Sequence, residues 1–131
     1  MAVREDGDTA RRVFDRSIMG DVVLTPGAAI LSSVDVMVNF VAYQPNAIGY
    51  VPSSRIASTA TPLVKTLRID GKAPASRAIA DGAYPMSRML SLVAAGEPRG
   101  ELRNFVAWAL SEEGQRLVSA ANYVSVLQAP Q

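Results

Sequence analysis

The chain has 131 residues, of which 49% are hydrophobic and 19% are charged, and its formal net charge is +1. This composition is typical of one globular domain rather than a disordered chain, and the nearly balanced charge argues against nucleic acid or an anionic membrane surface as a partner. The chain has no cysteine and no histidine, which excludes disulfides, thiol chemistry, Ser-His-Asp triads and imidazole-based metal sites.

The start of the chain is charged and lacks the uninterrupted apolar segment that a signal peptide has. No stretch approaches the roughly 18 consecutive apolar residues of a membrane span, so we expect no insertion into a membrane. A polar loop follows Met1 almost at once. From this abrupt start we expect the chain to be part of a longer protein.

That polar loop combines a guanidinium, a glycine turn and several free backbone N–H groups just before the first helical pattern. It reads Arg4-Glu5-Asp6-Gly7-Asp8-Thr9-Ala10-Arg11. A helix N-terminus leaves about four N–H groups unpaired and carries about half a positive charge, so such a loop can receive a small oxyanion. The alternative is plain helix capping by Asp8 or Thr9, with Arg4 as a solvated surface charge.

Helical spacing of apolar residues predicts a first helix over residues 9–19 and a second over residues 28–43. Between them, residues 22–24 form a short apolar run, which is either a strand or a packed connector. The second helix should end before Pro45, because a residue that precedes proline disfavours helical backbone angles.

The middle of the chain favours strands. Residues 47–51 are the clearest strand, and Gly49 within it indicates that another backbone or a ligand comes close. Residues 53–61 are small and polar, and they predict a loop or a short irregular helix. Residues 63–69 predict a second strand, which ends at a turn.

The following segment predicts a short helix and then a strand. The helix covers residues 74–81 and should end at Gly82, a typical C-cap. The strand is expected at residues 87–94, after a turn that contains Pro85.

The last part of the chain predicts two helices and a final strand. The first of these helices should bury one apolar face, which consists of Leu102, Phe105, Val106, Ala109 and Leu110. Ser111 should break or cap this helix before another helix over residues 112–121, with Leu117 and Val118 facing inward. Residues 123–127 predict a short strand.

Strands that alternate with helices predict an α/β fold, a small mixed sheet of three or four strands with about five helices. Such a sheet is thin for so many apolar helix faces. We therefore expect part of the core surface to be covered by a partner, either missing sequence or a second chain.

Catalysis is not expected. The serine pairs at residues 32–33 and 53–54 have no nearby base, and the chain contains no Gly-x-Ser-x-Gly elbow. Its carboxylates stand at turns and helix starts, where the helix dipole already accounts for them. No acidic run has metal-ligand spacing and no phosphate loop of the Gly-x-x-x-x-Gly-Lys type occurs, so we expect no catalytic residue, metal or cofactor.

Taken together, four segments resemble the phosphate-binding proteins of ABC importers, the PstS-like branch of the type II periplasmic binding proteins. Residues 4–11 resemble the Arg-x-Asp-Gly-Ser-Gly-Thr phosphate loop of that family. Residues 45–51 (Pro-Asn-Ala-Ile-Gly-Tyr-Val) resemble its Ala-Ile-Gly-Tyr strand. Two later segments also match, residues 81–88 (Asp-Gly-Ala-Tyr-Pro-Met-Ser-Arg) and residues 105–115, which end in Ala-Leu-Ser-Glu-Glu-Gly-Gln.

The resemblance implies a partial type II periplasmic-binding-protein fold, with residues 1–131 as a single module. Proteins of that family have two lobes, and a hinge closes the lobes over the ligand. Residues 1–46 resemble part of the second lobe, and residues 47–131 resemble part of the first. Only the C-terminal half is represented, so the N-terminal half that supplies the other ligand contacts is missing.

The resemblance also implies a ligand-binding set, namely Arg4, Asp6, Gly7, Asp8, Thr9 and Ala10. Arg4 matches the arginine that binds two phosphate oxygens through its planar fork. Asp6 matches the aspartate that can accept a proton from hydrogen phosphate and orient the arginine. Gly7 matches the glycine of the turn.

The next three positions depart from the family pattern. Asp8 stands where serine is expected, Thr9 replaces glycine and Ala10 replaces threonine. Two hydroxyl donors are lost from their usual places, each worth about 1.5–3 kcal/mol when it binds a charged group. Asp8 also adds a negative charge near the anion, which costs on the order of 1–4 kcal/mol at a separation of about 4 Å.

The resemblance therefore implies a solute-binding module for phosphate or a related small oxyanion, in an ABC-type uptake or sensing system. The alternative is a structural or interaction module that keeps the fold but has lost ligand binding. The implied partners are an ABC permease and either a second copy of the chain, as a homodimer, or the missing N-terminal half. The implied location is periplasmic or extracellular.

Overall fold

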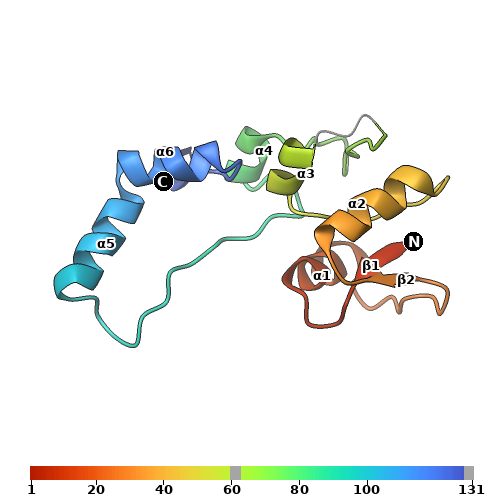
Figure 1. Ribbon diagram of the computed structural model, residues 1–131, viewed down its shortest axis with the longest axis horizontal. Helices are drawn as coiled ribbons and strands as arrows, with labels where there is room; N and C mark the ends of the chain where they lie inside the picture. Colours follow the sequence, from red (N-terminus) through yellow and green to blue (C-terminus); the bar gives the residue numbers. More distant parts are fainter. Residues whose placement is uncertain (60–62, 129–131) are drawn as a thin grey trace.

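The computed structural model describes residues 1–59 and 63–128 of the chain. The elements occur in the order β1 (Ala2–Arg4), α1 (Thr9–Phe14), the π-helical turn η1 (Asp15–Met19), β2 (Ala29–Leu31), α2 (Val34–Tyr43), α3 (Ser53–Thr59), α4 (Ser76–Ala80), α5 (Gly100–Leu110), α6 (Glu112–Ala120) and the 3₁₀ turn η2 (Val126–Gln128). Figure 1 shows an elongated molecule, with β1, β2, α1 and α2 at one end and α5 at the other.

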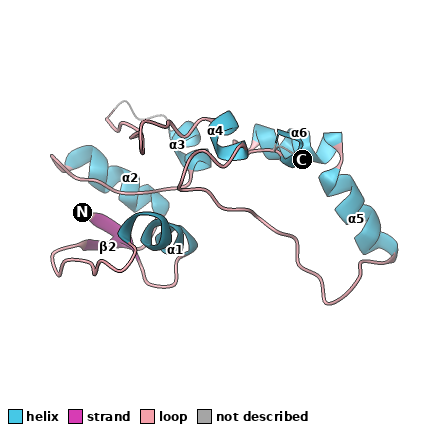
Figure 2. Ribbon diagram, turned by 180° about the vertical axis from the view of Figure 1, so that it is seen from behind, coloured by secondary structure: helices cyan, strands magenta, loops and turns pink. Residues whose placement is uncertain are grey.

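The two strands form a parallel pair, in which Ala2 lies opposite Ala29 and Arg4 lies opposite Leu31. Parallel strands need a crossover connection, and here the crossover contains α1 and η1. Figure 2 shows both strands beside α1 and α2. Since the strands are parallel, both end at the same edge of the sheet, where β1 leads toward α1 and β2 leads toward α2.

The core of this end of the molecule is small and partly aromatic. Val3 is fully buried, and the rings of Phe14 and Tyr50 stack with their centroids 4.4 Å apart. These three residues form one cluster. The cluster joins β1 and α1 to the segment that follows α2.

Gly49 allows this segment to lie against α2. A Cβ atom at Gly49 would be 2.5 Å from the Met37 Sδ and 3.1 Å from the Val41 Cγ2. A close approach is therefore present at Gly49, but it is made by the side chains of Met37 and Val41 on α2 and not by the backbone or ligand that the sequence predicted.

Helices α5 and α6 meet at a tight corner. Ser111 ends α5 and caps α6, since its Oγ accepts a hydrogen bond from the Gly114 N–H at 3.3 Å. A Cβ at Gly114 would lie 2.7 Å from the Ala109 carbonyl oxygen. The Gln115 side chain, 6% exposed, donates to the Ala109 carbonyl at 2.8 Å and accepts from the Val126 N–H at 2.9 Å. The expected role of Ser111 as a cap is confirmed. The tight corner leaves no room for a side chain at Gly114, and the Gln115 side chain bonds the backbone on both sides of it.

The predicted helices are mostly present. Residues 9–19 are helical, first as α1 and then as η1, while α4, α5 and α6 lie within a few residues of their expected positions. The short irregular helix allowed for residues 53–61 is α3, and residues 60–61 of that prediction lie outside the described residues. The predicted helix over residues 28–43 is wrong at its start, because residues 29–31 form β2 and Ser33 caps α2 through its Oγ.

The predicted strands are wrong. Residues 47–51, 63–69, 87–94 and 123–127 form no β-strand among the described residues. The first of these segments makes one ladder-like contact, in which the Ala2 N–H donates to the Ile48 carbonyl at 2.9 Å. The second contributes a single bridge between Ile69 and Lys72. A strand pattern needs a neighbouring strand to supply its hydrogen bonds, and the described chain gives these segments no such neighbour.

The predicted burial of the α5 face is also wrong. Leu102 is 48% exposed and Phe105 is 52% exposed, and Leu117 on α6 is 57% exposed. The periodicity correctly indicated an apolar face, but no described element packs over it.

Among the described residues, none of the helices has the length and the apolar character of a membrane span.

We predict that Gly49→Ala destabilises the chain by about 1–3 kcal/mol, because the added methyl group must displace the buried Met37 side chain. Urea unfolding followed by circular dichroism measures this difference. Gly96→Ala is the control, since a Cβ at Gly96 meets no atom within 4 Å. Equal unfolding midpoints for the two variants would contradict the close approach.

Candidate functional site

The candidate site lies at the carboxyl edge of the two-stranded sheet. β1 ends at Arg4 and β2 ends at Leu31, and the next helices begin within a few residues of each strand. Helix N-termini direct N–H groups and partial positive charge toward this edge. In open α/β sheets, ligands bind outside the carboxyl ends of the strands.

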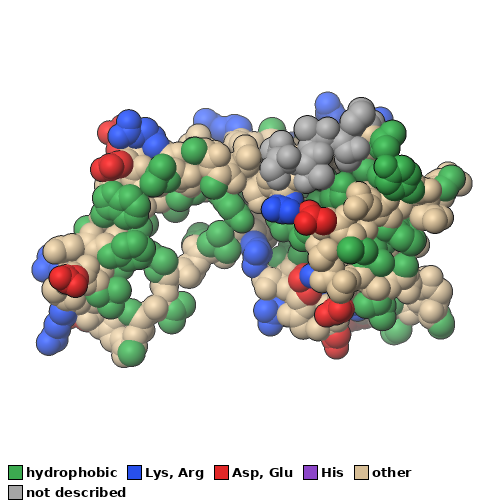
Figure 3. Space-filling view, viewed as in Figure 1, with side chains coloured by type: hydrophobic (Ala, Val, Ile, Leu, Met, Phe, Trp, Pro, Cys, Tyr) green, Lys and Arg blue, Asp and Glu red, His purple; other side chains and the backbone are tan. Residues whose placement is uncertain are grey.

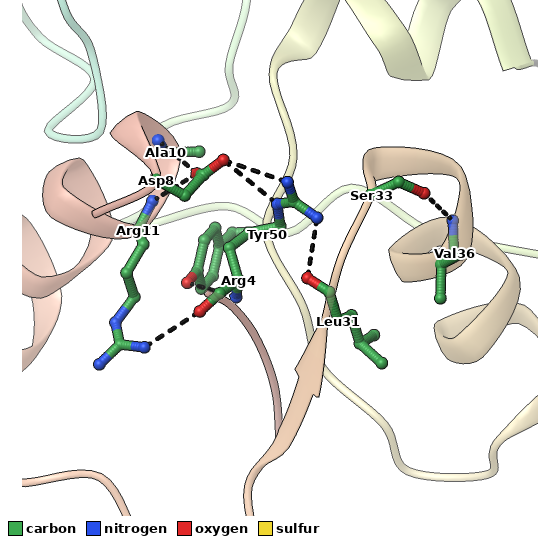
Figure 4. A network of polar contacts seen from close by, with 8 residues as sticks. All are labelled: Arg4, Asp8, Ala10, Arg11, Leu31, Ser33, Val36 and Tyr50. Atoms are coloured by element: carbon green, nitrogen blue, oxygen red, sulfur yellow. Dashed lines mark hydrogen bonds and ion pairs between the residues drawn. The ribbon is translucent and has the colours of Figure 1, made fainter. Parts of the chain in front are cut away.

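Arg4 connects the two strand ends. Its side chain is only 12% exposed. The Nη1 group donates to the Leu31 carbonyl at 2.8 Å, while Nε and Nη2 donate to the Asp8 Oδ2 at 3.3 and 3.2 Å (Figure 4). Arg4 is therefore no solvated surface charge, and that part of the capping interpretation is wrong.

Asp8 satisfies both groups of donors that an oxyanion would use. Its Oδ1 accepts from the Ala10 N–H at 2.8 Å and from the Arg11 N–H at 3.1 Å, so Asp8 is the N-cap of α1. Its Oδ2 accepts from Arg4, as Figure 4 shows. One carboxylate thus spans the guanidinium and the helix N-terminus. The capping role of Asp8 inferred from the sequence is present, together with an ion pair that the sequence did not indicate.

The environment of Asp8 favours its charged form. Burial raises the pKa of the Asp8 carboxyl, but hydrogen bonds from the Arg11 N–H, the Arg4 guanidinium and the Ala10 N–H outweigh burial, and the pKa lies below its usual range. The site therefore holds a permanent internal anion at neutral pH.

The other expected site residues lie around this pair without joining it. Asp6 is exposed, and its Oδ1 accepts from the Gly7 N–H at 3.1 Å. Gly7 has a φ of +86°, a backbone conformation that glycine adopts without strain. Thr9 is exposed at the start of α1, and Ala10 packs against the core. The carboxylate that contacts Arg4 belongs to Asp8 and not to Asp6.

Two residues that the sequence did not assign to the site hold its backbone. The Arg4 N–H donates to the Tyr50 hydroxyl oxygen at 3.0 Å, and Arg11 Nη1 donates to the Arg4 carbonyl at 3.1 Å. Burial raises the pKa of the Tyr50 phenol. Tyr50 was visible in the sequence as the aromatic residue of the Ala-Ile-Gly-Tyr segment, whereas its contact with a residue 46 positions earlier was not.

A second helix N-terminus faces the same edge. Ser33 Oγ accepts from the Val36 N–H at 3.1 Å and caps α2. The adjacent Ser32 is exposed. The guanidinium of Arg4 lies between the two helix starts, because it bonds both to Asp8 and to the carbonyl of Leu31 (Figure 4).

The chain is similar to known proteins over most of its length. A family model described as "PBP superfamily domain" matches residues 1–113. Proteins named phosphate-binding protein PstS 2, from Streptococcus agalactiae serotypes V and III, are 30% identical to the chain over 131 residues. That match covers 92% of this chain and 43% of each relative.

A solved structure has a similar fold. The phosphate-binding protein of a phosphate ABC transporter from Streptococcus pneumoniae matches with a TM-score of 0.78 and 24% identity. The match covers 95% of this chain and 51% of that protein. The chain thus has a partial PBP-like fold, and it spans about half the length of the relatives that it matches.

The structure predicts that Asp8 makes stability depend on acid pH. The folded-state pKa of Asp8 lies below that of the unfolded chain, so its carboxylate stabilises the fold at neutral pH, and this contribution is lost as the pH falls below about 4. Asp8→Asn, which can still cap a helix, should therefore cost about 1 kcal/mol at pH 7 and almost nothing near the acid limit.

Thermal melting from pH 7 down to about pH 3 measures this difference. Asp21→Asn is the control, since Asp21 is exposed and has no ion pair among the described residues. A gap between wild type and Asp8→Asn that stays constant with pH would contradict the electrostatic role of Asp8.

Proposed function

The chain belongs to the PBP superfamily, and we propose that it is a PstS-like solute-binding module for phosphate or a related small oxyanion. The proposed ligand-binding set is Arg4, Asp6, Gly7, Asp8, Thr9 and Ala10. The observation that carries the proposal is the position of the Arg4 guanidinium, largely buried at the carboxyl edge of β1 and β2 between two helix N-termini.

The Arg4 fork provides the main charge for an oxyanion. A planar guanidinium can donate two parallel hydrogen bonds to two phosphate oxygens. Here two of its nitrogen atoms are directed at one carboxylate oxygen of Asp8. A bound oxyanion takes over these donors when the Asp8 side chain rotates away, and the Ala10 and Arg11 N–H groups at the start of α1 become free for it as well.

The exposed residues of the loop complete the proposed contacts. Thr9 stands at the first position of α1 and offers a hydroxyl group to the ligand. Asp6 is exposed next to the Gly7 turn, where its carboxylate can accept the proton of a hydrogen phosphate. Breaking the Asp8 hydrogen bonds costs free energy, which offsets part of the free energy gained when the oxyanion binds. We therefore expect weaker binding than a chain with an uncharged residue at position 8 would show.

The proposed setting follows from the relatives. We infer that the chain serves an ABC-type uptake or sensing system outside the cytoplasm, with a permease as its partner, and that its role is binding rather than catalysis. Residues 1–46 would contribute to one lobe and residues 47–131 to the other, with the ligand between them. A second copy of the chain or the half that this chain does not cover would complete the module.

A second candidate function rests on Asp8 itself. The carboxylate already satisfies the Arg4 guanidinium and two N–H groups of α1. An internal anion of this kind can replace the ligand and stabilise the fold without it. The alternative is accordingly a structural or interaction module that keeps the fold and has lost ligand binding.

We predict that phosphate, at a concentration of about 100 times its Kd, stabilises the chain by about 2.7 kcal/mol, which raises the melting temperature. Thermal-shift titrations with phosphate, sulfate and molybdate measure the effect and rank the ligands. Arg4→Gln should abolish it, whereas Arg12→Gln on the exposed side of α1 should not. No shift with any anion up to millimolar concentrations would contradict a receptor role for this chain alone.

We also predict that Asp8→Ser combined with Ala10→Thr strengthens phosphate binding about 10- to 100-fold, because two hydroxyl donors return and a negative charge is removed. Calorimetry of the double variant against wild type measures the gain, with Asp21→Ser as a control for loss of charge alone. Phosphate binding by the double variant but not by the wild type would favour the structural alternative. No gain would mean that the loop is shaped for another ligand.

A further inference from the structure

The Asp8 carboxylate uses the donors that an oxyanion at Arg4 would use. Its Oδ2 accepts from Arg4 Nε at 3.3 Å and from Arg4 Nη2 at 3.2 Å, and its Oδ1 accepts from the Ala10 N–H at 2.8 Å. A guanidinium offers the same nitrogen atoms to a carboxylate and to a phosphate or sulfate group. An oxyanion that binds the Arg4 fork therefore has to displace the Asp8 side chain.

The Asp8 side chain has a route to water. It is 26% exposed, whereas the Arg4 side chain is only 12% exposed. The backbone of Asp8 stays in the turn through its N–H, which donates to the Glu5 carbonyl at 3.2 Å. A Cβ at the neighbouring Gly7 would meet no atom within 4 Å, so there is open space beside the turn. A rotation of the Asp8 side chain is thus enough to free Arg4.

The rotated carboxylate loses the contacts that keep it charged. In the chain without ligand, burial raises the pKa of the Asp8 carboxyl, but hydrogen bonds outweigh burial and hold the pKa below its usual range. The donors are the Arg11 N–H, the Arg4 guanidinium and the Ala10 N–H. When an oxyanion takes these donors, Asp8 has a negative charge beside it instead, and a neighbouring like charge favours the protonated carboxyl.

The other charged groups in this part of the molecule do not replace Asp8 in this role. Figure 3 shows acidic and basic side chains together over the part of the molecule that holds α1. The elements around Asp8 carry these charged or titratable side chains: Arg4 on β1, Arg11 on α1, Asp15 on η1, Asp35 on α2, Tyr50 after α2, and Glu5 and Asp6 in the loop.

Most of these groups keep their charge state when Arg4 changes partner. Asp15 accepts from Arg11 at 2.7 Å, and Asp35 accepts from Arg55 at 2.6 Å. The arginines stay charged at any mildly acidic pH, and the Tyr50 phenol stays neutral because burial raises its pKa. Among the described residues, Asp8 is the carboxylate that pairs with Arg4, so it is the group that ligand binding affects directly.

We propose that the binding of an oxyanion to Arg4 is coupled to the uptake of one proton by Asp8, so that the site binds small oxyanions more tightly at mildly acidic pH. This inference rests on the proposed oxyanion-binding function and specifies how that site is regulated. The proton comes from solvent and adds to a carboxylate oxygen of Asp8. Because the complex holds a proton that the free chain does not hold, mass action raises the affinity as the pH falls.

The choice of ligand separates a proton on the protein from a proton on the anion. Sulfate stays fully ionised at mildly acidic pH, so a proton that is taken up with sulfate goes to the protein. Phosphate titrates near neutral pH and remains a monoanion below that range. Both anions should therefore show the coupling between about pH 6 and about pH 4.5, which lies above the acid range in which the loss of the Asp8 contacts destabilises the fold.

The test is isothermal titration calorimetry of the 131-residue chain with sulfate and with phosphate, at about pH 6 and about pH 4.5, in buffers that differ in their enthalpy of ionisation. The difference in heat between buffers gives the number of protons taken up per bound anion. At the lower pH we expect uptake that approaches one proton and an affinity at least about threefold higher than at the upper pH. The NMR shift of the Asp8 carboxyl carbon should show a higher pKa in the presence of sulfate.

Matched variants assign the proton to one carboxylate. Asp8→Asn can still cap α1 but cannot titrate, so it should bind both anions with little proton uptake and with an affinity that is nearly constant with pH. Asp21→Asn removes the same charge at an exposed residue outside the loop, and it should keep the wild-type uptake. Asp6→Asn tests the other aspartate of the loop.

The outcomes distinguish a failure of this proposal from a failure of the proposed function. Binding with the same proton uptake in wild type and Asp8→Asn would overturn the coupling and leave the oxyanion-binding function standing, and so would an uptake that disappears in Asp6→Asn but persists in Asp8→Asn. Binding by Asp8→Asn alone, at both pH values, would overturn the coupling and favour the structural alternative. No binding of either anion, by either protein, at either pH would overturn the oxyanion-binding function and the coupling with it.

Discussion

The contact between the Arg4 guanidinium and the Asp8 carboxylate organises the N-terminal end of the molecule. Arg4 also bonds the end of β2 through the Leu31 carbonyl, and Asp8 also caps α1, so one ion pair connects both strands to the first helix. Tyr50 holds the Arg4 backbone from the other side and stacks on Phe14, which joins this network to the small core. The polar side chains of this network, those of Arg4, Asp8 and Tyr50, are at least partly buried, and each has a hydrogen-bond partner, as burial of polar groups requires.

This network brings together the kinds of hydrogen-bond donor that bind oxyanions, and the Asp8 carboxylate accepts from them. The fold presents a guanidinium and helix N–H groups to one point at the carboxyl edge of the sheet, and the Asp8 carboxylate occupies that point. In the phosphate-loop pattern that residues 4–11 resemble, a serine stands at the position of Asp8. Carboxylates and phosphates accept the same kinds of hydrogen bond, so the Asp8 carboxylate uses donors of the type that would also bind an oxyanion.

A second constraint is that the described part of the chain has a small hydrophobic core. Within the part of the chain that the structure describes, only a few hydrophobic residues are buried, and they lie mostly around β1, α1 and α2. At the other end, the α5–α6 corner is held by polar contacts of Ser111 and Gln115 while the apolar face of α5 remains open. The hydrogen bonds of the α5–α6 corner are thus satisfied, because their donors and acceptors are close in sequence. Where the expected partner is another sheet or helix layer, the chain by itself does not provide it.

The sequence by itself determined the elements whose contacts are local. The helices around residues 9–19 and 100–120, the caps at Asp8 and Ser111, and the tight approach at Gly49 all follow from spacing, side-chain type and the lack of a Cβ atom. The family resemblance was likewise legible in short motifs. Only the tertiary structure decided that the strand-like segments 63–69 and 87–94 form no β-strand among the described residues and that β1 and β2 form the sheet instead. It also decided that Arg4 is held by Asp8 and by a carbonyl 27 residues away. The reason is that a helix and its cap satisfy their hydrogen bonds within one or two turns, whereas a strand and a buried charge depend on partners that chain folding brings from elsewhere.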